Sequence, residues 1–113
     1  MTSKQNFYVT TAISYPNGRP HMGHAYEVIA TDAIARFHRL RGENVRFVTG
    51  TDEHGLKIAQ AARAADVTPR AYVDDMVQHF LAMAAKLNIS YDRFIRTTDA
   101  DHVASCQALW RAM

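Results

Sequence analysis

Two short runs rich in β-branched and aromatic residues constrain the fold most, because a segment with a helical period separates them. Residues 7–13 (FYVTTAI) and 45–51 (VRFVTGT) are predicted strands. Between them, from about residue 23 to 41, apolar residues recur at steps of three and four. Strand, helix and strand in this order form a βαβ unit, so the two strands are predicted to pair in parallel. The apolar face predicted for this helix comprises Ala25, Val28, Ile29, Ala33, Phe37 and Leu40.

The remainder of the chain continues the alternation. Further elements are predicted as helices over about 55–65 and 69–87, a short strand at 92–96 and a last helix from about 100. Asp52, Thr68 and Asp99 are placed to cap these helices, and Pro69 suits a first helical position. The fold class is therefore α/β, with a parallel sheet flanked by helices. Three strands are few for a doubly wound sheet, so we expect the chain to be part of a longer protein.

Several conspicuous residues are given structural interpretations. The predicted helix after Pro69 carries an apolar face made of Tyr72, Val73, Met76, Val77, Phe80, Met83, Ala84 and Leu87. Cys106 and Trp110 fall on the apolar face of the last helix and are predicted to be buried. The charged residues Asp74, Asp75, Arg36, Arg39 and Arg41 are predicted to be solvated, with a tRNA backbone contact as the alternative for the arginines.

The composition excludes several classes of protein. With 113 residues, 48% hydrophobic and 21% charged, the chain has the composition of a soluble globular protein. A net charge of +2 is too small to indicate a nucleic-acid surface by itself. The single cysteine cannot form an internal disulfide, and no apolar run is long enough for a signal peptide or a membrane span. We therefore expect a cytoplasmic protein without membrane association.

A pair of histidines follows the first predicted strand. His21 and His24 stand where a loop becomes a helix, at the strand end where ligands bind in open α/β sheets. Gly23 between them allows close approach of a ligand to the backbone, and the helix N-terminus favours an anion. The residues therefore predict a phosphate site built from side chains, although two exposed histidines on one helix face remain an alternative. Neither G-x-x-x-x-G-K-[ST] nor G-x-G-x-x-G occurs, which disfavours a P-loop or dinucleotide site.

The second predicted strand ends in TGTDEHG, at residues 49–55, on the same sheet edge. The carboxylate of Asp52 would face a cationic group there, so the two sites together indicate an amino compound beside a phosphate. Capping of the next helix is the structural alternative for this aspartate. A metal site is a further, disfavoured alternative, because the histidine spacing is not typical of zinc and no cysteine joins it. Its ligands would be His21, His24, Asp52, Glu53 and His54.

These stretches together resemble a known family. VTTAISYPNGRPHMGHAY, TGTDEHGLKI and FIRTTDADH are similar to the methionyl-tRNA synthetase family of class I aminoacyl-tRNA synthetases, in its bacterial and organellar form. HMGH stands at the family's H-I-G-H signature, with Met22 in place of isoleucine. The resemblance implies that residues 1–113 are the N-terminal portion of a Rossmann-like catalytic domain. It also implies that the connective insertion, the K-M-S-K-S half and the anticodon-binding domain are absent.

The resemblance also implies roles for individual residues. His21 and His24 would be catalytic, and with Gly23 they would bind ATP. Ala12, Ile13, Tyr15 and Asp52 would bind the amino acid. The implied reaction joins L-methionine to tRNA(Met) through methionyl-adenylate, with Mg²⁺ accompanying ATP. Zn²⁺ would belong to the absent connective insertion and not to this chain.

Alternatives from other functional classes remain open. One is a stand-alone nucleotidyltransferase that uses H-x-G-H on a cofactor precursor, and another is a non-catalytic module that binds nucleotide or tRNA. His54 could assist the ammonium site or cap its helix. We expect the 113-residue chain alone to be inactive in methionine activation.

Overall fold

The computed structural model describes residues 4–113 and contains a single parallel sheet with helices connecting its strands. The elements are β1 (Asn6–Thr10), α1 (Met22–Leu40), β2 (Asn44–Thr51), α2 (Leu56–Ala64), α3 (Pro69–Lys86), β3 (Arg93–Arg96) and α4 (Ala100–Ala112). β2 lies between β1 and β3 and pairs with both in parallel. The predicted α/β fold and the order of its elements are therefore confirmed.

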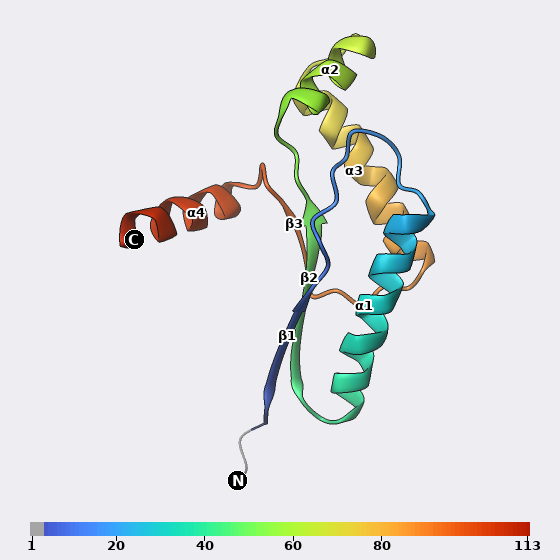
Figure 1. The fold of residues 1–113 in the computed structure, drawn as a ribbon, viewed down its shortest axis with the longest axis vertical. Coiled ribbons are helices and arrows are strands. Elements are labelled where there is room, and N and C mark those ends of the chain that lie inside the picture. The colour runs from blue at the N-terminus through green and yellow to red at the C-terminus, as the bar shows by residue number, and fades with distance from the viewer. Residues whose placement is uncertain (1–3) are drawn as a thin grey trace.

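Figure 1 shows α1 and α3 on the same side of the sheet, whereas α4 extends away on the other side. Most of the buried apolar residues belong to these two helices and the central strand, while Ile58 and Ala62 belong to α2. The former include Val28 and Ala35 of α1, Phe47 of β2, and Val77 and Phe80 of α3. Along β1, Phe7 stacks on His38 of α1 with ring centroids 3.5 Å apart. Its neighbour Tyr8 points to the opposite face of the sheet and is 66% exposed.

The first strand is shorter than predicted, ending at Thr10 and not at Ile13. The regular ladder ends with the bond from the N–H of Thr11 to the carbonyl of Val48 at 3.3 Å. The N–H of Ala12 donates to the carboxylate of Glu27 on α1, at 2.7 Å. Pairing resumes at Ser14, whose N–H donates to the carbonyl of Gly50 at 3.1 Å. The bond from Ala12 connects the carboxyl end of β1 to α1.

The buried face of α1 differs from the predicted one. Val28 is buried as expected, but Ile29, Phe37 and Leu40 are 47%, 56% and 89% exposed. The buried positions of this helix are Val28, Thr31, Asp32 and Ala35. Asp32 is buried because its carboxylate accepts hydrogen bonds from the backbone and hydroxyl of Ser90, in the connection between α3 and β3. A polar face of α1 therefore docks this connection.

Two of the three arginines predicted to be solvated also hold this connection. Arg36 donates to the carbonyl of Asn88 at 2.6 Å, and Arg39 donates to the hydroxyl of Ser90 at 2.6 Å. Arg41 is more exposed and pairs with Glu43 at 3.1 Å. The prediction of surface charge is confirmed for Arg36 and Arg41, which are exposed, whereas Arg39 is half-buried. Arg36 and Arg39 also have a structural role that the sequence did not predict.

The prediction that Cys106 and Trp110 are buried was wrong. Cys106 is exposed and Trp110 is 78% exposed, and α4 contains no buried residue. The physical reason is visible in Figure 1, where α4 extends away from the sheet and from the other helices. The apolar residues of α4 do recur with a helical period, but none of them is buried by another part of residues 4–113.

The helix starts agree with the sequence in part. Thr68 caps α3 by accepting from the N–H of Ala71, and Pro69 is its first residue, as predicted. Asp52 is not a cap, because Gly55 occupies the N-cap of α2 and makes no side-chain cap bond. Asp99 occupies the N-cap of α4, yet its carboxylate accepts from the backbone of Arg96 instead.

Asp74 keeps 45% of its side chain exposed, in agreement with the predicted solvated face, and it also forms ion pairs. Its carboxylate pairs with Arg70 at 3.1 Å and with Arg96 at 2.5 Å. The buried residues predicted on the same helix are confirmed at Val73, Val77, Phe80 and Ala84. Within residues 4–113 no helix is both long and apolar enough to span a membrane.

Candidate active site

The histidine pair forms the cap of α1. His21 is the N-cap residue, with φ −124° and ψ −179°, and its Nδ1 accepts from the N–H of Gly23 at 3.0 Å. His24 reaches back, and its Nδ1 accepts from the N–H of His21 at 3.1 Å. This is a reciprocal capping box in which two imidazoles replace the usual hydroxyl and carboxylate.

The capping box determines which nitrogen carries the proton on each ring. A neutral imidazole has one donor and one acceptor nitrogen, and Nδ1 is the acceptor in both residues. The proton of neutral His21 and His24 is therefore on Nε2. Each ring can donate a hydrogen bond from Nε2, beside a helix N-terminus that favours an anion.

His24 is held in its neutral form. Its pKa is lowered mainly by burial and further by the neighbouring His21, while Glu27 acts in the opposite direction. The two imidazole centroids are 4.0 Å apart, and His24 also contacts the edge of Phe80 on α3 at 5.2 Å. At neutral pH this ring is a hydrogen-bond donor and not a cation.

Gly23 is required by the geometry of this cap. A Cβ at this position would lie 2.8 Å from Cε1 and 3.0 Å from Nδ1 of the His21 ring, closer than real Cβ contacts. A side chain would therefore push His21 out of its capping position. The cap is therefore a second reason for a glycine between the histidines, beside the close approach of a ligand that the sequence suggested.

The predicted amino-acid site lies where the chain after β1 meets the end of β2. Ser14 bridges to Thr51, and the N–H of Asp52 donates to the carbonyl of Ser14 at 2.8 Å. Asp52 is half-buried, and its carboxylate takes part in none of the side-chain hydrogen bonds or ion pairs within residues 4–113. A fixed backbone with a free carboxylate is suited to receive a cationic group.

The other residues predicted to bind the amino-acid substrate lie around this junction. The hydroxyl of Tyr15 approaches Gly55 so closely that a Cβ there would lie 2.8 Å from it, and Gly55 has φ +112°. Tyr15 therefore reaches the TGTDEHG segment. Ile13 is 51% exposed and Ala12 is exposed, so both are accessible from solvent.

Two acidic residues position the site, although the sequence did not indicate Glu27 and indicated Glu53 only as a ligand of the disfavoured metal site. The carboxylate of Glu27 accepts from the N–H of Ala12. The sequence feature that could have indicated this residue is an acidic side chain one helical turn after His24. Glu53 is 4% exposed and pairs with Arg96 at 2.7 Å. Sequence spacing carried no signal for this pair, because β3 delivers the arginine from 43 residues away.

The predicted residues fall into two groups at the carboxyl-terminal edge of the sheet. His21 lines an open groove of about 560 Å³ between the start of α1 and the second half of α3. Ala12, Ile13, Tyr15 and Asp52 do not line this groove and gather at the strand ends instead.

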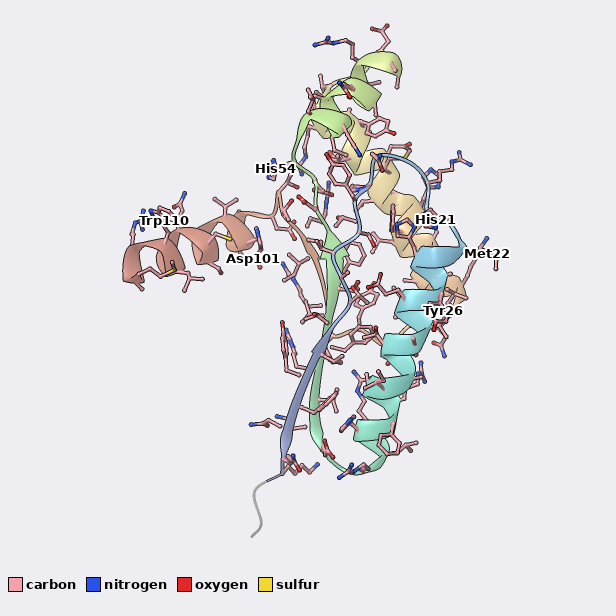
Figure 2. All side chains as sticks on the ribbon, viewed as in Figure 1. His21, Met22, Tyr26, His54, Asp101 and Trp110 are labelled. Atoms are coloured by element: carbon pink, nitrogen blue, oxygen red, sulfur yellow. The ribbon has the colours of Figure 1, made fainter. Side chains whose placement is uncertain are left out.

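The disfavoured metal site is not assembled. His54 is exposed and lies on the side of the sheet toward α4, away from His21 (Figure 2). Within residues 4–113 no three His, Cys, Asp or Glu side chains come together in a metal-binding arrangement.

Comparisons with known proteins show the family to which the chain belongs. The model of the family described as tRNA synthetases class I (M) matches residues 7–113. Methionine–tRNA ligase of Mycobacterium bovis is 64% identical over 107 residues, which is 95% of this chain and 21% of the relative. The corresponding ligase of Brucella suis biovar 1 is 55% identical over 111 residues, covering 98% of this chain and 22% of the relative.

A solved structure supports the same relationship. Mycobacterium tuberculosis methionyl-tRNA synthetase in complex with methionyl-adenylate superposes with a TM-score of 0.92 at 63% identity. The match covers 95% of this chain and 21% of that protein, so the chain spans about a fifth of the length of its relatives. The parallel sheet with its flanking helices is the N-terminal part of a class I synthetase Rossmann-like fold. By sequence and by fold, the chain belongs to the methionyl-tRNA synthetase family of class I tRNA synthetases.

Proposed function

We propose that this chain supplies the H-x-G-H part of a methionine–tRNA ligase. The enzyme would activate L-methionine with ATP and transfer it to tRNA(Met) in the cytoplasm. The observation that carries the proposal is the histidine capping box, which places two Nε2–H donors beside the N-terminus of α1. The free carboxylate of Asp52 at the same sheet edge adds a receptor for the substrate ammonium.

The proposed reaction needs no nucleophile from the protein. A carboxylate oxygen of methionine attacks the α-phosphorus of ATP, the bond to the β-phosphate bridging oxygen breaks, and pyrophosphate leaves. His21 and His24 would donate from Nε2 to phosphate oxygens, where charge accumulates in the transition state. A neutral, pre-oriented donor suits this task because it needs no reorganisation during the reaction.

The amino-acid part of the site would bind a zwitterion of modest size. Asp52 would accept from the ammonium group, and Tyr15 would form a wall on the TGTDEHG side. A thioether side chain is soft and nearly non-polar, so its selection rests on shape and aromatic contact. Mg²⁺ would enter with the phosphates of ATP, and we assign no residue of this chain to it.

The test is amino-acid-dependent exchange between ATP and pyrophosphate by the full-length enzyme. Each of the twenty amino acids is offered separately, and we expect exchange with methionine alone. Exchange with a different amino acid would support the proposed reaction and contradict methionine as its substrate. A folded enzyme that exchanges with none of them would reject adenylate formation and favour a module that only binds nucleotide or tRNA.

A further inference from the structure

Glu53 is a fully buried carboxylate immediately beside Asp52. Its side chain has no solvent exposure, yet it carries a charge that is costly to bury without partners. Three donors surround it: the Arg96 guanidinium at 2.7 Å, the Thr51 hydroxyl at 3.2 Å, and the hydroxyl of Thr98. Because these donors satisfy the buried carboxylate, its position is fixed, and we refer to Glu53 with these partners as the Glu53 anchor.

The anchor connects the end of β2 to two other elements. Arg96 ends β3, and its Nη2 also donates to Asp74 of α3 at 2.5 Å. The backbone is held at the same place, because the N–H of Glu53 donates to the hydroxyl of Thr97 at 2.8 Å. Glu53 therefore joins the end of β2 to the turn after β3 and, through Arg96, to the first half of α3.

Asp52 is the one acidic residue of this segment that stays free. Glu53 points into the network, and its neighbour is left with an unpaired, half-buried carboxylate. The N–H of Asp52 is bound to Ser14 on the other side. The direction of the Asp52 side chain is thus determined by backbone bonds on one side and by the Glu53 anchor on the other.

We propose that Glu53 is a positioning residue for amino-acid binding. Held by Arg96, it fixes the backbone on which Asp52 presents its carboxylate to the substrate ammonium. This role rests on the proposed function, since it assumes that Asp52 receives that ammonium. Glu53 itself contacts no substrate, because its side chain is completely buried.

The test is the variant Glu53→Gln in the full-length enzyme, assayed by ATP–pyrophosphate exchange. A glutamine turns an amide N–H₂ toward groups that are themselves donors, so the anchor loosens. We expect the KM for methionine to rise by about 10- to 100-fold, as when an outer residue that orients a ligand-binding group is lost. The KM for ATP should stay unchanged.

Glu43→Gln is the matched control. Glu43 is also a buried glutamate, 7% exposed in its side chain, and it pairs with His38 at 2.6 Å and with Arg41. It precedes β2, at the opposite end of the strand from Asp52. This variant should lose stability while keeping the wild-type KM for methionine.

A milder variant covers the case in which Glu53→Gln does not fold. Thr98→Val removes one donor to the Glu53 carboxylate and leaves Arg96 in place. Its KM for methionine should rise less than in Glu53→Gln, with the KM for ATP again unchanged. The double variant Glu53→Gln/Arg96→Gln should recover part of the loss, because two facing amides can satisfy one another.

The outcomes separate this role from the proposed function. Wild-type exchange with methionine, together with an unchanged methionine KM in Glu53→Gln and Thr98→Val, overturns the role of Glu53 alone. Equal effects of Glu53→Gln and Glu43→Gln on that KM also overturn it, because they would reflect general destabilisation. No methionine-dependent exchange by the wild-type enzyme would overturn both the proposed function and this role.

Discussion

His24 has a structural and a proposed chemical role in one ring, and these roles can be separated by substitution. Nδ1 caps α1, and Nε2 is the donor proposed for a phosphate oxygen. His24→Ala removes both, so the full-length enzyme should lose roughly 1 kcal/mol of stability and about 100-fold in adenylate formation. His24→Gln should retain the cap, because glutamine also serves at the N3 position of a capping box.

The measurement is a comparison of adenylate formation rate with ATP affinity. The rate should fall more than the affinity in His24→Ala, since a hydrogen bond to developing charge strengthens in the transition state. His102→Ala, on the exposed helix α4, is the control and should change neither. An equal loss of rate and affinity would contradict a transition-state role for His24.

The lowered pKa of His24 predicts a pH dependence of stability. The unfolded chain has the ordinary histidine pKa of about 6.5 and takes up a proton more readily than the folded chain. The contribution of His24 is therefore complete above this value, and it is lost as the pH falls toward the lowered folded pKa. Urea unfolding at pH 7.5 and pH 5 should show this loss in the wild-type chain and less of it in His24→Gln.

Asp52 is tested by an isosteric change. Asp52→Asn keeps the shape and removes the charge, so an ammonium partner should lose at least 1.5 kcal/mol of binding, roughly tenfold in the KM for methionine. Asp75→Asn is the control, because its side chain is 71% exposed on α3. Unchanged methionine kinetics in Asp52→Asn would mean that this carboxylate does not receive the substrate ammonium.

At the scale of elements, the sequence predicts each strand and helix but not how they meet. The helical period of apolar residues in α1 is clear in the sequence. In the structure, however, the charged Asp32 is buried and the apolar Phe37 is exposed, the reverse of what their polarity predicts. The reason is Ser90, which binds Asp32 from 58 residues away, a contact that no local pattern encodes. The histidine pair was predictable because its geometry is local, whereas the Glu53 partner Arg96 comes from another strand.

The contact between β2 and β3 gives a prediction at this scale. A Cβ on Gly50 would collide with the carbonyl group of Ile95 on β3, so Gly50→Ala should separate the paired strands. We expect a loss of roughly 3 kcal/mol or more, measured by chemical unfolding of the chain. Gly18→Ala is the control, because no atom lies within 4 Å of a Cβ there. Equal stability of the two variants would contradict the strand register described here.

At the scale of the whole molecule, the chain is more extended than a compact domain of its length. Its radius of gyration is 16.2 Å, whereas about 13 Å is expected for a compact domain of this size. Tyr8 on β1 is largely exposed. Trp110 on α4, far from the sheet in Figure 2, is also largely exposed. The sequence predicted a buried Trp110 because an apolar helix face does not reveal whether anything covers it.

This openness leads to the last prediction, that the 113-residue chain alone does not activate methionine. Adenylate formation depends on positioning and on neutralising phosphate charge in a site that excludes water. His21 lines an open groove, and residues 1–113 contain no K-M-S-K-S segment to supply further cations. The isolated chain and the full-length enzyme should be compared at equal concentration by methionine-dependent exchange, after circular dichroism has established folding. Robust exchange by the folded chain would show that His21, His24 and Asp52 suffice.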